Sequence, residues 1–524
     1  MSTDNYSHKD SHRSIMKSTS VLSLGTLSSR ILGFLRDVIL AKVLGTGFRA
    51  DALFVAFRIP NLLRNFVGEG ATNSAVVPVF SEYLINKKKE EFWQFISVVL
   101  VLALIVLSIL TLLGILLAPV IVRLIAPGFI TDPEKLALTV SLTKIIFPYL
   151  IFIGLTAYSM AILYTFRSFA APAFSPCLLN ISIIVSALLS SRYLKEPVYG
   201  LAVGIVLGGI LQLLVQMPSL LKIGIKFQIP KTLKHPGALK VGKLLGPRLI
   251  GAGVYQFTVL IDTFCASLSM IVGVGGISAI YYSNRIIQFP MGVFTIALAS
   301  AVLPTLSGLA TNGQMDQMKR TIIFSLENIF FVMLPTSVIM MILSAPIIRL
   351  LFQRGEFNQY STMITSSALL YYAIGLFGFG GIKILVTAFH SLQDTKTPVK
   401  IAALCLAINA ALNFILMGPM KIAGIALASS IAATIDFLLL FYLFRKKIGK
   451  FGIGVRSFLI KILFASFVVA VLIKMSWTYM TIPYEVVKLF IVCIGAYVVY
   501  GFLCFQLKVE QAKKVYHWVT GRIK

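Results

Sequence analysis

Apolar residues recur along this chain in long runs, separated by short breaks that are rich in charged residues, glycine or proline. Each run is close to the roughly 20 residues that a helix needs to cross the hydrocarbon of a bilayer. Helices are expected in the membrane because a helix satisfies its backbone hydrogen bonds internally. The pattern predicts an all-α polytopic membrane protein with about 14 transmembrane helices. They lie near residues 19–44, 48–84 (with an internal break), 92–126, 135–167, 172–191, 197–222, 239–271, 276–308, 317–352, 360–391, 397–417, 421–445, 457–475 and 484–506.

Composition supports the same class. The 524 residues are 58% hydrophobic and only 13% charged, and the mean hydropathy is +0.90. A soluble core cannot bury that much apolar surface, so soluble classes are excluded. Residues 1–16 are polar and are expected to form a disordered cytoplasmic tail. No cleavable signal peptide is expected, because the first apolar run is long and carries Arg30 and Arg36.

The chain has a formal net charge of +28, from 47 Lys and Arg against 19 Asp and Glu. In a soluble protein this excess would indicate nucleic acid as a partner. Here the basic residues gather in alternate loops, such as residues 87–89, 222–243 and 445–447, and the loops between them are sparser. The positive-inside rule then predicts that both termini are cytoplasmic. We expect membrane lipids, and no nucleic acid, as partners of these clusters.

Several segments occur twice, about 225 residues apart, as expected for an internal duplication. The paired segments are 117–124 with 344–350, 165–168 with 388–391, 200–202 with 424–426, and 77–81 with 303–307. An even number of helices separates the copies, so both enter the membrane in the same orientation, with a cleft or central cavity between two lobes. The predicted regions are an N-lobe at 17–225 (helices 1–6), a C-lobe at 226–450 (helices 7–12), an added helix pair at 451–508 and a cytoplasmic tail at 509–524.

Arginines inside the apolar runs are the main functional candidates. They are Arg30, Arg36, Arg58, Arg64 and Arg285. A guanidinium at the centre of a lipid-exposed helix costs about 2.5 to 3.5 kcal/mol, so such residues normally face protein or water. They therefore predict a hydrated cavity. Arg30 and Arg36 would lie about 240° apart on a straight helix, and a bend at Gly33 would bring them closer.

The guanidinium group presents a planar fork of donors that matches phosphate and carboxylate oxygens two at a time. An anionic, phosphorylated and amphiphilic substrate is therefore expected. Two arginines have acids seven residues away on the same helical face, giving the predicted pairs Arg30–Asp37 and Asp51–Arg58. The alternative is that these arginines serve only in structural ion pairs or extend toward the membrane surface.

A second polar group lies in the later apolar runs. Asp262, Asn409 and Asn413 carry hard oxygen ligands that suit a small cation such as sodium. Ser429 and Ser430 fall within the twelfth apolar run. The alternative is that these side chains hydrogen-bond across packed helices. Two further acids lie in apolar runs, Glu327 and Asp436.

Motifs for catalysis or nucleotide binding do not occur: the chain has no phosphate-binding loop, no HExxH and no GxSxG. We therefore do not expect an enzyme or a bound cofactor. A polytopic glycosyltransferase would need catalytic acids in a large outward loop, and a drug exporter would need acids in its cleft. A passive scaffold would leave the arginines unexplained.

Three segments, 29–37 (SRILGFLRD), 51–64 (DALFVAFRIPNLLR) and 69–71 (EGA), closely resemble the signature of the MurJ (MviN) lipid II flippases. The resemblance continues through residues 147–149, 171–176, 281–285 and 396–400. It implies the multidrug/oligosaccharidyl-lipid/polysaccharide exporter fold, in the bacterial inner membrane. It also implies that lipid II, an undecaprenyl-pyrophosphate-linked peptidoglycan precursor, is moved from the inner to the outer leaflet by alternating access. A flippase for another polyprenyl-pyrophosphate-linked oligosaccharide remains an alternative.

The resemblance also assigns roles to residues. It implies cavity arginines at Arg30, Arg36, Arg64 and Arg285, and a functional acid at Asp51. We also expect Ser29, Asp37 and Arg58 to bind the substrate. It implies a sodium site at Asp262, Asn409 and Asn413, although Asn413 stands where an acid is expected. Asn284 and Gln288 likewise replace acids beside Arg285. Sodium or the membrane potential is the candidate driving force, and other cell-wall synthesis proteins are candidate partners.

Overall fold

The computed structural model describes residues 4–67, 71–449 and 454–519, and these residues form helices joined by short turns, with no strand among them. The predicted all-α class is confirmed. The chain divides into two compact units, Met1–Gln256 and Phe257–Lys524. This division falls within helix α11 (Pro236–Ser267), beyond the predicted lobe boundary at residues 225 and 226.

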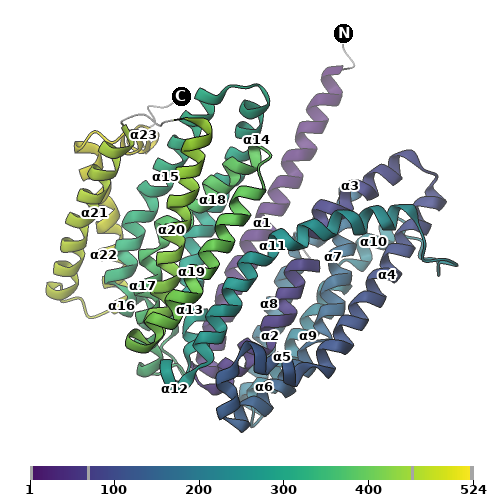
Figure 1. The fold of residues 1–524 in the computed structure, drawn as a ribbon, viewed down its shortest axis with the longest axis horizontal. Helices are drawn as coiled ribbons and strands as arrows, with labels where there is room; N and C mark the ends of the chain where they lie inside the picture. Colours follow the sequence, from purple (N-terminus) through teal and green to yellow (C-terminus); the bar gives the residue numbers. More distant parts are fainter. Residues whose placement is uncertain (1–3, 68–70, 450–453, 520–524) are drawn as a thin grey trace. The chain divides into compact units, whose positions relative to one another are not determined.

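The first unit contains the helices drawn from purple to blue-teal in Figure 1. They are α1 (Asp4–Leu44), α2 (Phe48–Val67), α3 (Ala71–Asn86), α4 (Lys89–Leu116), α5 (Ala118–Ile125), the 3₁₀ turn η1 (Pro127–Thr131), α6 (Pro133–Ile146), α7 (Tyr149–Thr165), α8 (Ala170–Tyr193), α9 (Pro197–Leu214) and α10 (Met217–Lys222). Within this unit α8 packs along both α1 and α9, and α2 packs on α6.

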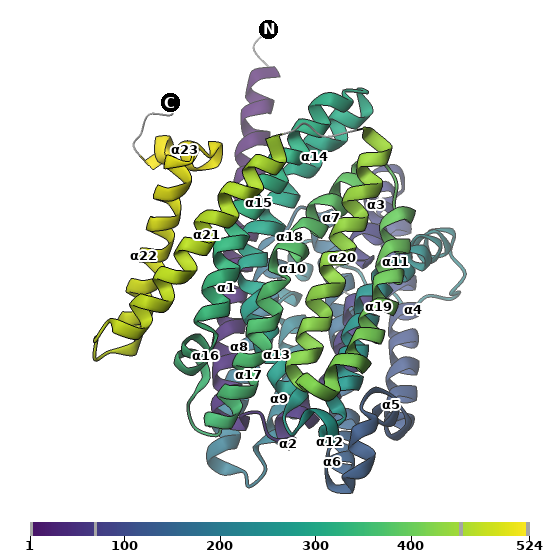
Figure 2. The ribbon, with the colours of Figure 1, turned by 60° about the vertical axis from the view of Figure 1, so that its left-hand side comes forward.

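The second unit follows in green and yellow. Its helices are α12 (Ser269–Val272), α13 (Gly276–Pro290), the π-helical turn η2 (Met291–Ile296), α14 (Ala297–Thr311), α15 (Met315–Ile342), α16 (Ser344–Phe352), α17 (Gln359–Ile374), α18 (Leu376–Ser391), α19 (Lys396–Met420), α20 (Ile422–Ile448), α21 (Gly454–Tyr479), α22 (Glu485–Gln506) and α23 (Glu510–Val519). Figure 2 shows α21 and α22 side by side, with α23 across the end of α22.

Ten helices in the described part of the chain are long and apolar enough to cross a membrane. An eleventh span is added if α17 and α18, which meet at a 48° bend, count as one. The predicted number of about 14 stays a prediction. Helix α2 shows why a hydropathy count runs low, because its 20 residues include Arg49, Asp51, Arg58 and Arg64. The charges that suggest function also make such a helix less apolar.

The predicted duplication is confirmed by the helix boundaries. Helix α4 begins and ends 226 residues before α15, from Lys89 to Met315 and from Leu116 to Ile342. The N-terminal caps of α6 and α17 repeat at the same distance. The Asp132 side chain accepts a hydrogen bond from the backbone of Lys135, and the Asn358 side chain accepts one from the backbone of Ser361. The two copies therefore share one backbone plan.

The repeat extends to a strained turn in each unit. Arg167 follows α7 with φ +57°, and Gln393 follows α18 with φ +59°. Both are left-handed residues without the conformational freedom of glycine, so packing on either side must hold them there. The amides that follow close each turn, because Ser168 N donates to the Leu163 carbonyl and Asp394 N donates to the Phe389 carbonyl.

One prediction differs from the structure at the amino end. Residues 1–16 are expected to be disordered, but α1 already begins at Asp4, and residues 1–3 lie outside the described part. The first glycine or proline after the initiator is Gly25, so nothing in this polar segment interrupts the helical backbone.

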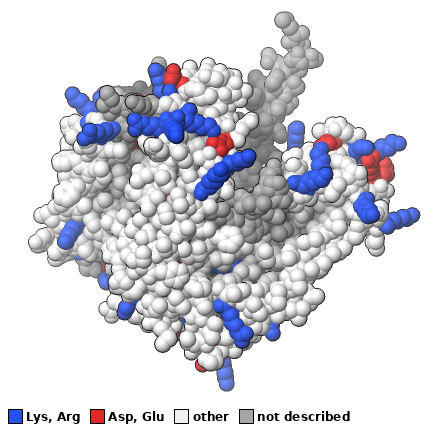
Figure 3. Space-filling model, in the orientation of Figure 1, with Lys and Arg blue, Asp and Glu red and all other residues white. Residues whose placement is uncertain are grey.

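Charge is distributed along the second unit as its topology predicts. On the face drawn in Figure 3, Lys and Arg side chains gather near the ends of its helices, and the middle of the face is nearly uncharged. A broad uncharged band between charged ends is what a surface in contact with lipid requires. The chain is thus a multi-pass membrane protein.

Candidate substrate-binding site

Arg36 is enclosed by protein and held by three side-chain hydrogen bonds. Its side chain is only 9% exposed, and it forms an ion pair with Asp37, which is fully buried. Arg36 Nη2 and Nε both donate to Asp37 Oδ1, at 2.7 and 3.0 Å. Two donors on one carboxylate oxygen fix the plane of the guanidinium. Arg36 therefore faces protein, and the predicted hydrated cavity stays a prediction.

Asn180, on α8, completes the Arg36 site. Its Oδ1 accepts a hydrogen bond from Arg36 Nη1 at 3.0 Å, and its Nδ2 donates to the backbone carbonyl of Ser29 at 3.1 Å. Helix α1 runs through Gly33 without a break, and a Cβ at Gly33 would lie 3.7 Å from Asn180 Nδ2. Asn180 therefore links both ends of the Ser29–Asp37 segment to α8.

Arg30 lies elsewhere on α1, where its side chain is exposed. The predicted Arg30–Asp37 pair is wrong, because Asp37 faces inward and is paired with its neighbour Arg36. Although the two positions share a helical face, seven residues separate them by about 10.5 Å along the helix axis. Asp37 pairs instead with the adjacent Arg36. Arg30 and Arg36 thus stand in different surroundings, one open and one enclosed.

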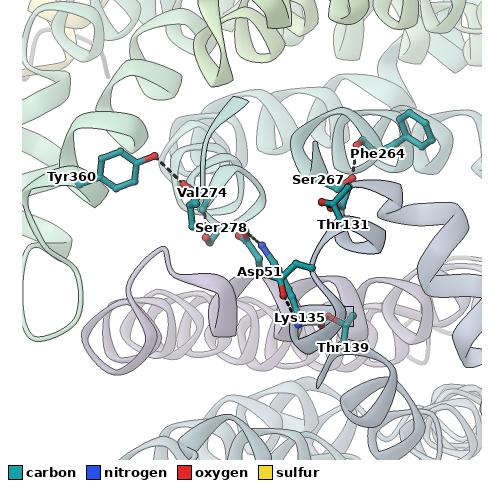
Figure 4. A network of polar contacts seen from close by, with 12 residues as sticks. Asp51, Thr131, Lys135, Thr139, Phe264, Ser267, Val274, Ser278 and Tyr360 are labelled. Atoms are coloured by element: carbon teal, nitrogen blue, oxygen red, sulfur yellow. Dashed lines mark hydrogen bonds and ion pairs between the residues drawn. The ribbon is translucent and has the colours of Figure 1, made fainter. Parts of the chain in front are cut away.

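The acid of α2 is paired with a residue that the sequence analysis did not select. Lys135 Nζ lies 2.9 Å from Asp51 Oδ2, and the two side chains are 5% and 2% exposed. The same ammonium lies 4.2 Å from the centre of the Phe129 ring. Figure 4 shows Lys135 directed at Asp51, with Thr139 one turn farther along α6. Arg58 and Arg64 are partly buried on the same helix as Asp51.

Arg285 lies on α13 of the second unit and is partly buried. Its Nη1 donates to Gln288 Oε1 at 3.2 Å, and Gln288 Nε2 donates in turn to Asn284 Oδ1 at 3.3 Å. Its guanidinium also lies 5.7 Å from the centre of the Tyr281 ring. These amide and aromatic neighbours orient the guanidinium without adding a negative charge.

The second predicted polar group comes together in the second unit. Asp262 Oδ1 accepts a hydrogen bond from Asn413 Nδ2 at 2.9 Å, and Asp262 Oδ2 accepts one from Ser429 at 3.1 Å. Asn409 joins them, because its Nδ2 donates to Ser429 and its Oδ1 accepts from Asn413. All four residues are buried. The predicted convergence of α11, α19 and α20 at this point is confirmed.

These side chains bond mainly to one another, Asn413 Oδ1 has no hydrogen-bond partner among the described residues, and the predicted sodium site stays a prediction. Both carboxylate oxygens of Asp262 already accept hydrogen bonds from neutral protein donors, and the amide of Asn413 points its nitrogen at the carboxylate. Sodium would need oxygen atoms directed at the same point, and an amide nitrogen is a donor and not a ligand for a hard cation. As arranged here, the four side chains form a hydrogen-bonded cluster across packed helices.

The two further acids have different surroundings. Glu327, on α15, accepts a hydrogen bond from Gln511 of α23 at 2.9 Å. Asp436 is partly buried on α20.

The sequence analysis did not select two residues of the site, Asn180 and Lys135, because their sequence signals are modest. Asn180 is an amide in the middle of an apolar run, and Lys135 follows the helix-capping Asp132–Pro133 pair.

Comparison with known proteins agrees with this architecture. The family model described as lipid II flippase MurJ matches residues 40–495. A probable lipid II flippase MurJ of Buchnera aphidicola is 35% identical, over 91% of this chain and 94% of the relative. The corresponding protein of Vibrio cholerae is 37% identical over 82% of each chain. The lipid II flippase MurJ of Burkholderia cenocepacia is 34% identical, over 90% of this chain and 92% of the relative.

Solved structures give the same result. A lipid II flippase MurJ in an inward closed conformation superposes with a TM-score of 0.78 at 30% identity, covering 93% of this chain and 98% of the other. An inward-facing multidrug resistance MATE transporter of the MOP superfamily gives a TM-score of 0.66 at 15% identity, which shows a shared fold alone. With the family model and these relatives spanning most of its length, the chain belongs to the lipid II flippase MurJ family.

Proposed function

We propose that this chain moves lipid II from the inner to the outer leaflet of the bacterial cytoplasmic membrane by alternating access, with both termini in the cytoplasm. The observation that carries the proposal is the enclosed Arg36 site, a full positive charge oriented by Asp37 and Asn180 within an apolar helix. It occurs in a chain that resembles lipid II flippases over most of its length.

The arrangement around Arg36 suits a recurring phosphate contact. An ion pair with Asp37 offsets the cost of burying the guanidinium, and Asn180 holds its orientation. A pre-oriented donor loses little entropy when a phosphate arrives and binds it in a defined geometry. In this proposal Arg30, Arg58 and Arg64 supply further donors to the pyrophosphate from α1 and α2, and Ser29 and Asp37 form the walls around it.

In this proposal Arg285 is the phosphate-binding residue of the second unit. Because Gln288 and Asn284 are neutral, no carboxylate of this amide chain competes with the phosphate for the guanidinium. The conformational change of alternating access then lowers the affinity for the pyrophosphate, and the lipid is released into the outer leaflet.

The membrane potential supplies a sufficient bias in this proposal, without sodium bound at Asp262. A potential that is negative inside favours outward movement of a net anion by about 2.3 kcal/mol per charge for each 100 mV. The substrate carries a pyrophosphate, so its outward step is downhill to the extent that protein cations do not move with it. The chemistry is binding and release, and no covalent step is assigned to the chain.

A depletion experiment tests the function. A bacterium depleted of its own lipid II flippase is complemented with this chain, and lipid II in the outer leaflet is measured with a membrane-impermeant reagent that attacks its headgroup. We expect outer-leaflet lipid II and growth to return together. If another polyprenyl-pyrophosphate-linked oligosaccharide crosses while lipid II stays inside, the chain is a flippase for a different substrate.

A further inference from the structure

The segment between α10 and α11 combines lysines with apolar side chains that point outward. Phe227 is 57% exposed and Ile229 is 87% exposed. The lysines of the segment, Lys222, Lys226, Lys231 and Lys234, are all exposed. Figure 1 draws residues 223–235 as an irregular teal trace beside α4 in the first unit. Exposed apolar residues flanked by lysines are typical of an element that lies at a membrane surface.

Specific contacts hold this segment against the first unit. The backbone N–H of Gln228 donates to Ser97 Oγ of α4 at 3.1 Å. The His235 ring stacks on Phe95, with ring centres 5.0 Å apart. Gly237 is pressed against the same aromatic ring, since a Cβ there would lie 2.6 Å from it. The middle of the segment, at Gln228, and its last residue, His235, are thus held against α4.

The contact with Ser97 sets the depth of the segment. Ser97 lies eight residues into α4, which is about 12 Å along the helix axis from the charged start at Lys89. Phe227 and Ile229 flank the residue bonded to Ser97 and therefore lie below the level of the lysine-rich end of α4. Apolar groups of membrane-surface elements insert by about 5 to 10 Å at the boundary between headgroups and acyl chains.

Charge at this end is strongly positive. Lys87 pairs with Glu91 and Lys240 pairs with Glu82. Lys88 and Lys89 at the start of α4 are exposed and basic, as are the lysines of the segment. Among the residues that the structure describes, no acid forms an ion pair with Lys226, Lys231 or Lys234. The surface therefore complements an anionic one.

We propose that residues 222–235 form a membrane-surface anchor, in which Lys226, Lys231 and Lys234 bind anionic phospholipid headgroups while Phe227 and Ile229 insert among the acyl chains. The anchor binds the leaflet that lies on the side of the lysine-rich loops. It is separate from substrate transport, because none of these residues belongs to the arginine site.

Depth is measured with the full chain in nanodiscs of phosphatidylcholine, with or without phosphatidylglycerol. A nitroxide is attached at Ile229→Cys, and a control nitroxide at Thr232→Cys, an exposed polar position of the same segment. We expect oxygen, which partitions into the bilayer, to speed the spin relaxation of the nitroxide at 229. A water-soluble nickel complex should speed the spin relaxation of the nitroxide at 232. If the label at 229 is reached by the nickel complex in both membranes, the insertion proposal fails.

Headgroup binding is measured with fluorescent phosphatidylglycerol and the chain in neutral detergent. The variant K226Q/K231Q/K234Q should bind about 100-fold more weakly, since each lysine contributes about a factor of five near an anionic surface. The matched control K421Q/K474Q/K488Q removes the same charge elsewhere and should bind as the parent does. Equal binding by both variants overturns the lysine assignment. If added lipid II displaces the fluorescent phosphatidylglycerol, the surface binds the substrate and the proposal is overturned.

Discussion

The two units share a backbone plan but place different chemistry on it. Helices α4 and α15 match end for end at a spacing of 226 residues. In the first unit, buried charged side chains lie in pairs, Arg36 with Asp37 and Lys135 with Asp51. In the second unit a single carboxylate, Asp262, is surrounded by amide and hydroxyl donors. The apolar pattern preserves the fold, so a few polar positions can diverge in function.

The largest expected effect follows from breaking the charge pair of the first unit. Arg36→Ala should abolish lipid II transport and also lower stability by about 3 to 5 kcal/mol, because the buried Asp37 carboxylate would lose its ion pair with Arg36. Transport is measured by complementation with leaflet-resolved lipid II, and stability by thermal unfolding in detergent.

A double substitution separates the two effects. Arg36→Gln with Asp37→Asn removes both charges and keeps hydrogen-bonding groups beside Asn180, so most of the stability should return. Transport should remain absent, because the guanidinium for the phosphate is gone. Transport by a stable double variant would contradict the role proposed for Arg36.

The second charge pair of the first unit provides the next test. Lys135→Gln should cost about 3 to 5 kcal/mol by leaving Asp51 buried without its cation. Asp51→Asn with Lys135→Gln should restore much of that stability, and the four thermal unfolding measurements form a double-mutant cycle. Additive losses would mean that the 2.9 Å contact contributes no coupling energy.

These two sites show what the sequence can and cannot predict. Long apolar runs and repeated segments predict helices such as α4 and α15, because membrane spans and their ends depend on local residues. Partners depend on packing. Asn180 is 144 residues from Arg36, and Lys135 is 84 residues from Asp51. No local pattern pairs such residues, so the sequence identified Arg36 and Asp51 but missed the side chains that hold them.

The amide cluster of the second unit can be converted to test its contrast with the first. Asn413→Asp would place a second carboxylate beside Asp262 and replace the donor amide with oxygen ligands. Without a cation the variant should unfold at lower temperature because the like charges repel. Sodium at about 100 times its dissociation constant should then restore about 2.7 kcal/mol. The parent chain should show no such sodium dependence, and a sodium-dependent parent would contradict the proposed hydrogen-bonded cluster.

The smallest effect concerns the left-handed turns that the units share. In the second unit, the turn after Gln393 carries Asp394, whose carboxylate accepts a hydrogen bond from Lys447 Nζ at 2.7 Å. It also accepts from Thr397 N and Oγ1, at 3.0 and 2.8 Å. Ser168 holds the corresponding place in the first unit. The hydrogen bond from Lys447 is the main reason that the pKa of Asp394 falls from 3.8 to about 2.

A lowered pKa stabilises the fold only where the carboxylate is ionised. The contribution of Asp394 should be present above the unfolded pKa of 3.8 and should disappear as the pH falls to about 2. It amounts to about 2 kcal/mol of unfolding free energy. Asp394→Asn should therefore lower the unfolding temperature near neutral pH and match the parent at the acidic end. Ser168→Ala, at the matching turn, should shift stability equally at every pH, because its hydroxyl does not titrate. A pH-independent loss in Asp394→Asn would mean that this turn is held by packing, as the left-handed residue before it is in both units.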